Sequence, residues 1–111
     1  MVHVDEYVKV SKEVFAPLGE LVKIGLFKDE KDALKSIILE QAGAKIAHYK
    51  HEVGKLKSKY GVNFTEFKAR IENRKEEEVY SEWDDYIQWE SYEKALRYWT
   101  EIEARVKAHI T

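Results

Sequence analysis

Large aromatic side chains crowd the C-terminal third of the chain more densely than one face of a helix can bury. Seven aromatic residues, among them all three tryptophans, lie between positions 80 and 99. The apolar spacing from about residue 77 to residue 109 is typical of a helix. Because each helical residue turns by about 100°, rings at every third position wind around the helix instead of lining one side. Five rings do so: Tyr80, Trp83, Tyr86, Trp89 and Tyr92.

The helix expected at residues 77–109 therefore has two apolar faces. The aromatic residues of its first third and the apolar residues of its last half point in mean directions about 150° apart. Either the helix breaks near Trp89 to Ser91, or it stays continuous and contacts different partners on its two sides. A small monomer cannot cover both faces, so at least one is expected to bind a second copy or a foreign protein.

Two helices are expected between residues 17 and 60. Pro17 suits a first helical position, which predicts a short helix that ends before Gly25. Asp29 is a favourable N-cap for a long helix, whose later apolar residues recur at alternating spacings of four and three as far as Tyr60. A break in this helix at Gly43 is an alternative, since glycine is unfavourable in a helix interior.

Residues 61–66 carry the strongest local signal in the chain. Gly61 occupies the position where a helix commonly ends in a left-handed residue. Asn63, with Glu66 three residues later, forms a capping-box pattern that starts a new helix. We expect that short helix at about residues 64–72, ended by Asn73.

At the N-terminus, β-branched and polar residues alternate from Val2 to Val14, the pattern of a strand with one apolar face. It is the only strand that the sequence predicts. A lone strand leaves its backbone groups unpaired, so its partner is expected to be the same strand of a second copy. The expected fold is therefore mainly α: one N-terminal strand paired across a homodimer, a long helix and a C-terminal helical arm.

Composition narrows the class of protein. A chain of 111 residues, 44% hydrophobic and 36% charged, suits one folded domain, and no apolar stretch approaches the ~20 residues of a membrane span. It has no cysteine, which excludes disulfides and thiolate sites. No secretory leader pattern opens the chain, so we expect a cytoplasmic protein, and the bias toward Lys, Glu and Arg is typical of hyperthermophiles.

Charge is unevenly distributed, although the net charge is only -2. Residues 45–59 carry five lysines against one glutamate, whereas residues 76–93 carry eight carboxylates and no basic residue. The two segments either face each other or form separate solvated surfaces.

Motifs for catalysis or metal binding are not found. The five glycines are isolated, so there is no phosphate-binding loop, and no Ser or Lys lies in a nucleophile motif. Two groups of possible cation ligands are more simply interpreted as solvated surface: His48, His51 and Glu52, and Glu82, Asp84 and Asp85. We expect a protein that is not an enzyme and takes no metal or cofactor.

Three N-terminal stretches carry a family resemblance: VKVSKEVF at residues 8–15, GLF at 25–27 and DAL at 32–34. With Leu18, Leu21 and Val22 between them, residues 4–42 resemble the ribbon-helix-helix fold of small bacterial and archaeal DNA-binding regulators and antitoxins. The resemblance implies a dimerisation and DNA-binding segment at residues 1–42, followed by a helical partner-binding region at residues 43–111, within one compact chain.

Further motifs follow: KYG at residues 59–61, FTEF at 64–67 and EWDDY at 82–86, then Trp89, Glu90 and Tyr92. This part resembles the C-terminal region of an archaeal family of antitoxins from toxin–antitoxin pairs, of the TumA kind. The resemblance implies a non-catalytic antitoxin, which dimerises through its N-terminal strand and neutralises a co-encoded toxin with its acidic, aromatic C-terminal helix.

The ribbon-helix-helix resemblance also implies binding to operator DNA, and hence autoregulation. In that fold, outward strand residues enter the major groove and the start of the second helix contacts phosphate. The corresponding residues are Asp5, Tyr7, Lys9, Lys28 and Lys31. These few lysines can neutralise only a little of the phosphate charge of DNA. The alternative is therefore a ribbon that serves dimerisation and does not bind DNA.

The C-terminal helix gives the stronger physical argument for a partner. Trp and Tyr dominate binding hot spots, and the carboxylates between them suit a basic toxin whose groove accepts nucleic acid. The expected partner-binding residues are Tyr80, Trp83, Asp84, Asp85, Tyr86, Trp89, Tyr92 and Trp99. Three alternatives are residues 80–99 as ordinary core packed on residues 45–59, a ribbon-helix-helix transcriptional repressor, and a helical adaptor without a toxin.

Overall fold

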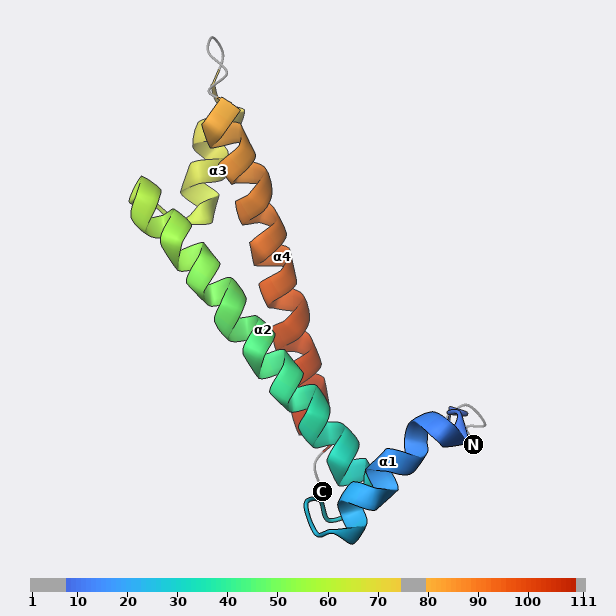
Figure 1. Cartoon of the computed structure of the whole chain (residues 1–111). Coiled ribbons are helices and arrows are strands. Elements are labelled where there is room, and N and C mark those ends of the chain that lie inside the picture. The colour runs from blue at the N-terminus through green and yellow to red at the C-terminus, as the bar shows by residue number, and fades with distance from the viewer. Residues whose placement is uncertain (1–7, 75–79, 110–111) are drawn as a thin grey trace, which may run out of the picture. The chain divides into compact units, whose positions relative to one another are not determined.

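The computed structural model describes residues 8–74 and 80–109, and every regular element within these ranges is a helix (Figure 1). The helices are α1 (Lys12–Lys23), α2 (Glu30–Tyr60), α3 (Phe64–Glu72) and α4 (Tyr80–Ala108). The chain divides into two compact units, Met1–Ile37 and Ile38–Thr111. None of the helices in the described ranges combines the length and the apolarity that a membrane span requires.

The predicted N-terminal strand is wrong wherever the structure describes it. Residues 2–7 lie outside the described residues, residues 8–11 form neither strand nor helix, and α1 begins at Lys12. Since residues 8–74 and 80–109 contain no strand, the ribbon-helix-helix prediction is corrected to an all-helical fold.

The sequence of α1 explains why a helix forms here. Val14 and Phe15 begin the apolar series that the rest of α1 continues at helical spacing. The Ser11 carbonyl accepts hydrogen bonds from the amides of Val14 and Phe15, at 3.1 and 3.0 Å. A helix satisfies these backbone groups within one chain, whereas a lone strand needs a neighbour. The helix begins at Lys12, so the predicted start at Pro17 is wrong. Pro17 lies inside α1.

Little of the apolar surface of the N-terminal unit is buried. α1 contains no buried residue, and among residues 8–37 only Ala33, in the first turn of α2, is fully buried. Large side chains stay exposed in this unit, among them Val8, Val10, Val14, Ile24 and Leu26. Apolar exposure on this scale is typical of a surface that another molecule covers.

The turn between α1 and α2 has the predicted chemistry. Gly25 takes a φ of 84°, in the left-handed region that favours glycine. The Asp32 amide donates a hydrogen bond to Asp29 Oδ1 at 2.7 Å, so Asp29 caps α2 as predicted. α2 then continues to Tyr60, and the break considered at Gly43 does not occur.

In the C-terminal unit, α4 runs back along α2, and α3 packs against α4 near the end of α2 (Figure 1). Gly61 reverses the chain with a φ of 69°, and the Glu66 amide donates to Asn63 Oδ1 at 2.9 Å. The predicted cap and the short helix that follows it are confirmed. α4 is one continuous helix, so the break considered near Trp89 to Ser91 is wrong.

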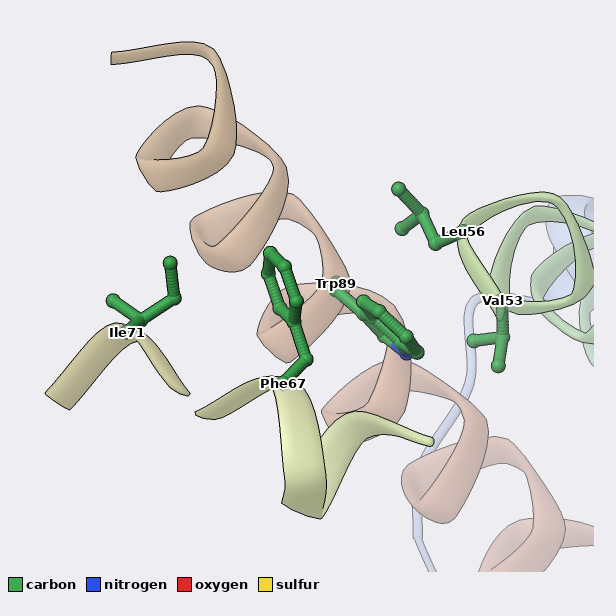
Figure 2. Close-up of a cluster of buried hydrophobic side chains, with 5 residues drawn as sticks. All are labelled: Val53, Leu56, Phe67, Ile71 and Trp89. Carbon is green, nitrogen blue, oxygen red and sulfur yellow. The ribbon is translucent and has the colours of Figure 1, made fainter. Parts of the chain in front are cut away.

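Five side chains from three helices form the core of this unit (Figure 2). They are Val53 and Leu56 of α2, Phe67 and Ile71 of α3, and Trp89 of α4. Trp89 and Phe67 have no solvent exposure, and their ring centroids lie 5.3 Å apart. The start of α4 is therefore held in place by contacts with both α2 and α3.

Candidate protein-binding site

The predicted partner-binding residues of α4 lie in three different environments. Trp89 is fully buried. Four are partly buried: Asp85, Tyr86, Tyr92 and Trp99. Three are exposed: Tyr80, Trp83 and Asp84. Only the exposed set is available to a partner without disturbing the core.

Trp89 belongs to the core rather than to a binding surface. Its ring lies 5.6 Å from that of Phe64 and 6.3 Å from that of Tyr60, measured between centroids. Its Nε1 donates a hydrogen bond to Glu93 Oε1 at 3.2 Å, which satisfies the one polar group of the side chain. For Trp89, the alternative of ordinary core packing is the correct one.

Asp85 joins α4 to the end of α2. Lys59 Nζ donates to Asp85 Oδ2 at 2.6 Å, and the Tyr60 hydroxyl donates to the same oxygen. Burial raises the pKa of Asp85, but the hydrogen bonds from Lys59 and Tyr60 outweigh burial and hold this pKa below its usual value. Burial and the bond to Asp85 raise the pKa of Tyr60. Of the two alternatives for the basic and acidic segments, the Lys59–Asp85 ion pair supports the one in which they face each other.

Other carboxylates of the acidic segment also bind within the unit. Glu82 forms an ion pair with Arg74, which follows α3. Glu90 Oε2 accepts from the Tyr86 hydroxyl at 3.3 Å, and Glu90 Oε1 lies 3.5 Å from Lys94 Nζ. Part of the acidity that suggested a basic toxin is therefore engaged within the unit.

Tyr92 and Trp99 also lie away from the exposed face. The Tyr92 ring packs 5.9 Å from that of Tyr49 on α2. Trp99 is partly buried, and its ring meets that of Tyr98 edge to face at 5.3 Å. The second apolar face of α4 is thus at least partly covered by α2, as the continuous-helix alternative requires.

The exposed face at the start of α4 has three large side chains. The exposed fractions are 75% for Tyr80, 50% for Trp83 and 52% for Ile87. Residues three or four positions apart are neighbours on a helix, so these side chains adjoin one another. Ile87 is not among the predicted partner-binding residues, although its spacing from Tyr80 and Trp83 is a sufficient signal.

Aromatic stacking connects this exposed face to the core. The Trp83 ring stacks on Tyr86 with centroids 5.5 Å apart and an interplanar angle of 28°. The Tyr86 ring in turn stacks on Phe64 of α3 at 5.8 Å and 17°. Trp83 therefore packs on Tyr86 with one side of its ring, while half of the side chain stays exposed to solvent.

Two of the residues expected to contact DNA, Asp5 and Tyr7, lie outside the described residues. Lys9, Lys28 and Lys31 are exposed, and the Lys28 amide donates to Asp32 Oδ2 at 3.0 Å. Since the part of the chain that the structure describes has no ribbon, DNA binding stays a prediction with no support from the fold.

Within the described ranges, no three His, Cys, Asp or Glu side chains are arranged to hold a metal ion. The His48 ring instead meets the Tyr49 ring edge to face at 5.0 Å. No protein family, curated protein or solved structure matched the chain in comparisons with known proteins. The function is accordingly argued from the geometry of α4.

Proposed function

We propose that this chain is a non-catalytic binding protein that holds a partner protein against the exposed start of α4, as the antitoxin of a toxin–antitoxin pair. The observation that carries the proposal is the exposure of Trp83. Half of this ring faces outward between Tyr80 and Ile87, on a helix that the core holds in place.

The energetics favour a protein as the occupant of this face. Fully covering an exposed tryptophan side chain brings roughly 2 to 3 kcal/mol through apolar area removed from water, and half of Trp83 remains to be covered. Hot spots of protein interfaces are enriched in Trp and Tyr. The stacking of Trp83 on Tyr86 also restricts the ring before binding, which reduces the entropy lost when a partner docks.

The antitoxin assignment is supported by the resemblance of residues 59–92 to antitoxins of the TumA kind. Residues of the EWDDY motif of that resemblance lie in two environments. Asp85 and Tyr86 contact α2 and α3, whereas Trp83 and Asp84 are exposed. In this proposal the former build the scaffold, the latter contact the toxin, and no N-terminal ribbon is required.

Co-expression with the protein encoded by the adjacent gene tests the proposal. We expect a stable complex, with affinity measured by isothermal titration calorimetry. Trp83→Ala should weaken it by about tenfold or more, as expected for a hot-spot residue. Tyr98→Ala is the matched control, because Tyr98 is also exposed on α4 but lies eleven residues beyond Ile87.

The proposal fails if the wild-type chain forms no complex with that protein in a purified mixture. It also fails if Trp83→Ala and Tyr98→Ala weaken the complex equally, because the interface would then not be the start of α4. Trp89→Ala is unsuitable as a test of binding, since Trp89 is a core residue.

A further inference from the structure

Asp84 borders the exposed apolar face at the start of α4. It stands four residues after Tyr80 and three before Ile87, and side chains at these spacings are neighbours on a helix surface. It directly follows Trp83, and consecutive side chains on a helix point about 100° apart. A single carboxylate thus adjoins two of the three large apolar side chains of this face, each at least half exposed.

The carboxylates on either side of Asp84 in the sequence are engaged, whereas Asp84 is not. Glu82 pairs with Arg74, and Asp85 accepts from Lys59 and Tyr60. The Asp84 side chain is exposed and makes no hydrogen bond or ion pair with the residues that the structure describes. Its negative charge is therefore available to an incoming molecule.

A partner that covers the three apolar side chains also removes water from Asp84. Burying an unpaired carboxylate opposes association, whereas a partner charge that pairs with it supports binding and fixes its register. Charge complementarity therefore indicates that the partner's contact surface is apolar and carries a positively charged group opposite Asp84.

We infer that the partner presents an arginine whose guanidinium pairs with Asp84 and lies against the exposed ring of Tyr80; this rests on the proposed function. A guanidinium is planar, stacks on aromatic rings and forms bidentate bonds with a carboxylate, which suits a site that combines the two. Tyr80 stands one helical turn before Asp84, and its side chain is 75% exposed.

The same charge disfavours nucleic acid as the occupant of this face. Aromatic platforms that stack bases lie in positively charged grooves that follow the phosphate backbone. Here the charged side chain at the edge of the face is Asp84, a carboxylate without a cationic partner among the described residues. The occupant of this face is therefore a protein with an apolar surface that carries an arginine.

The test uses the full chain and the protein encoded by the adjacent gene as the probe. We expect Asp84→Asn to weaken the complex by about tenfold or more, and Asp84→Arg to abolish it. The control is Glu101→Gln, which removes an exposed carboxylate from the same helix outside the face and should leave affinity unchanged. Far-UV circular dichroism and thermal unfolding check that each variant is folded.

A second measurement identifies the cation. Each arginine of the probe is changed to alanine, and a double-mutant cycle with Asp84→Asn is completed for those that weaken binding. We expect one arginine to couple strongly to Asp84, so that the second substitution adds little to the first.

Five outcomes would overturn the inference. Asp84→Asn could leave affinity unchanged while Trp83→Ala weakens it, in which case the proposed function survives. Glu101→Gln could weaken the complex as much as Asp84→Asn does, or no arginine could couple to Asp84. A single-stranded DNA or RNA oligonucleotide could bind in a manner that requires Trp83. A wild-type chain that does not bind the probe removes both the inference and the proposed function.

Discussion

The hydroxyl of Tyr60, the last residue of α2, donates a hydrogen bond to Asp85 Oδ2 near the start of α4. Lys59 Nζ donates to the same oxygen at 2.6 Å. Two adjacent aspartates therefore differ in role: Asp85 holds two helices together, while Asp84 stays exposed. Substitution of these two residues should therefore affect stability differently.

The Tyr60–Asp85 contact makes stability depend on pH at both extremes. The pKa of Asp85 is depressed in the folded state, so its contribution is present above the unfolded value of about 4 and is lost as pH falls through the folded pKa. The pKa of Tyr60 is raised, so its contribution is present below about 10 and is lost as pH rises through the folded pKa. Urea unfolding between pH 3 and pH 11 measures both.

Asp85→Asn should lower the free energy of unfolding at neutral pH by about 1 kcal/mol, because a partly exposed ion pair is screened by solvent. It should also flatten the decline in acid. Asp84→Asn is the matched control and should change neither quantity measurably. Equal losses in the two variants would mean that the Asp85 contact does not stabilise the fold.

Trp89 and Trp83 should differ sharply in their effect on stability. Trp89→Ala empties the centre of the core and should cost about 3–5 kcal/mol, or prevent folding. Trp83→Ala removes a half-exposed ring and should cost about 1 kcal/mol or less. Denaturant unfolding monitored by circular dichroism makes the comparison. Similar costs for both would contradict the assignment of Trp89 to the core and Trp83 to the surface.

Glycines of α2 and of the turn after it should respond oppositely to alanine. A Cβ at Gly54 meets no atom within 4 Å, so Gly54→Ala should stabilise the helix by about 0.5–1 kcal/mol. Gly61 has a φ of 69°, so Gly61→Ala should destabilise the protein by about 1 kcal/mol. The shifts in melting temperature give the two signs, and a stabilising Gly61→Ala would contradict the turn geometry.

The homodimer also stays a prediction, although residues 8–14, part of the segment that first suggested it, contain no strand. Val14 on α1 is 70% exposed and belongs to the apolar surface that the N-terminal unit leaves uncovered. We expect sedimentation equilibrium to show a dimer that Val14→Glu weakens. Glu20→Lys, which changes an exposed polar position of the same helix, is the control. A wild-type chain that stays monomeric at all concentrations would contradict the prediction.

Where a few neighbouring residues decide the backbone, the sequence was sufficient. Asp29 caps α2, Gly61 reverses the chain and Asn63 caps α3, each as its local chemistry predicts. The strand predicted for the N-terminal segment was wrong because it too rested on a local pattern. Val14 ends the alternating pattern, but with Phe15 it also begins a helical series, so a local pattern could not separate the two structures.

The roles of the aromatic residues required the packed chain. Helical spacing in α4 showed that its rings face different directions, but not which of them the rest of the chain covers. Trp89 is buried because Val53 of α2 and Phe67 of α3 meet around it, and Trp83 is exposed because no described side chain covers its outer half. Burial depends on residues distant in the sequence, so only the assembled helices distinguish a core tryptophan from one that is free to bind.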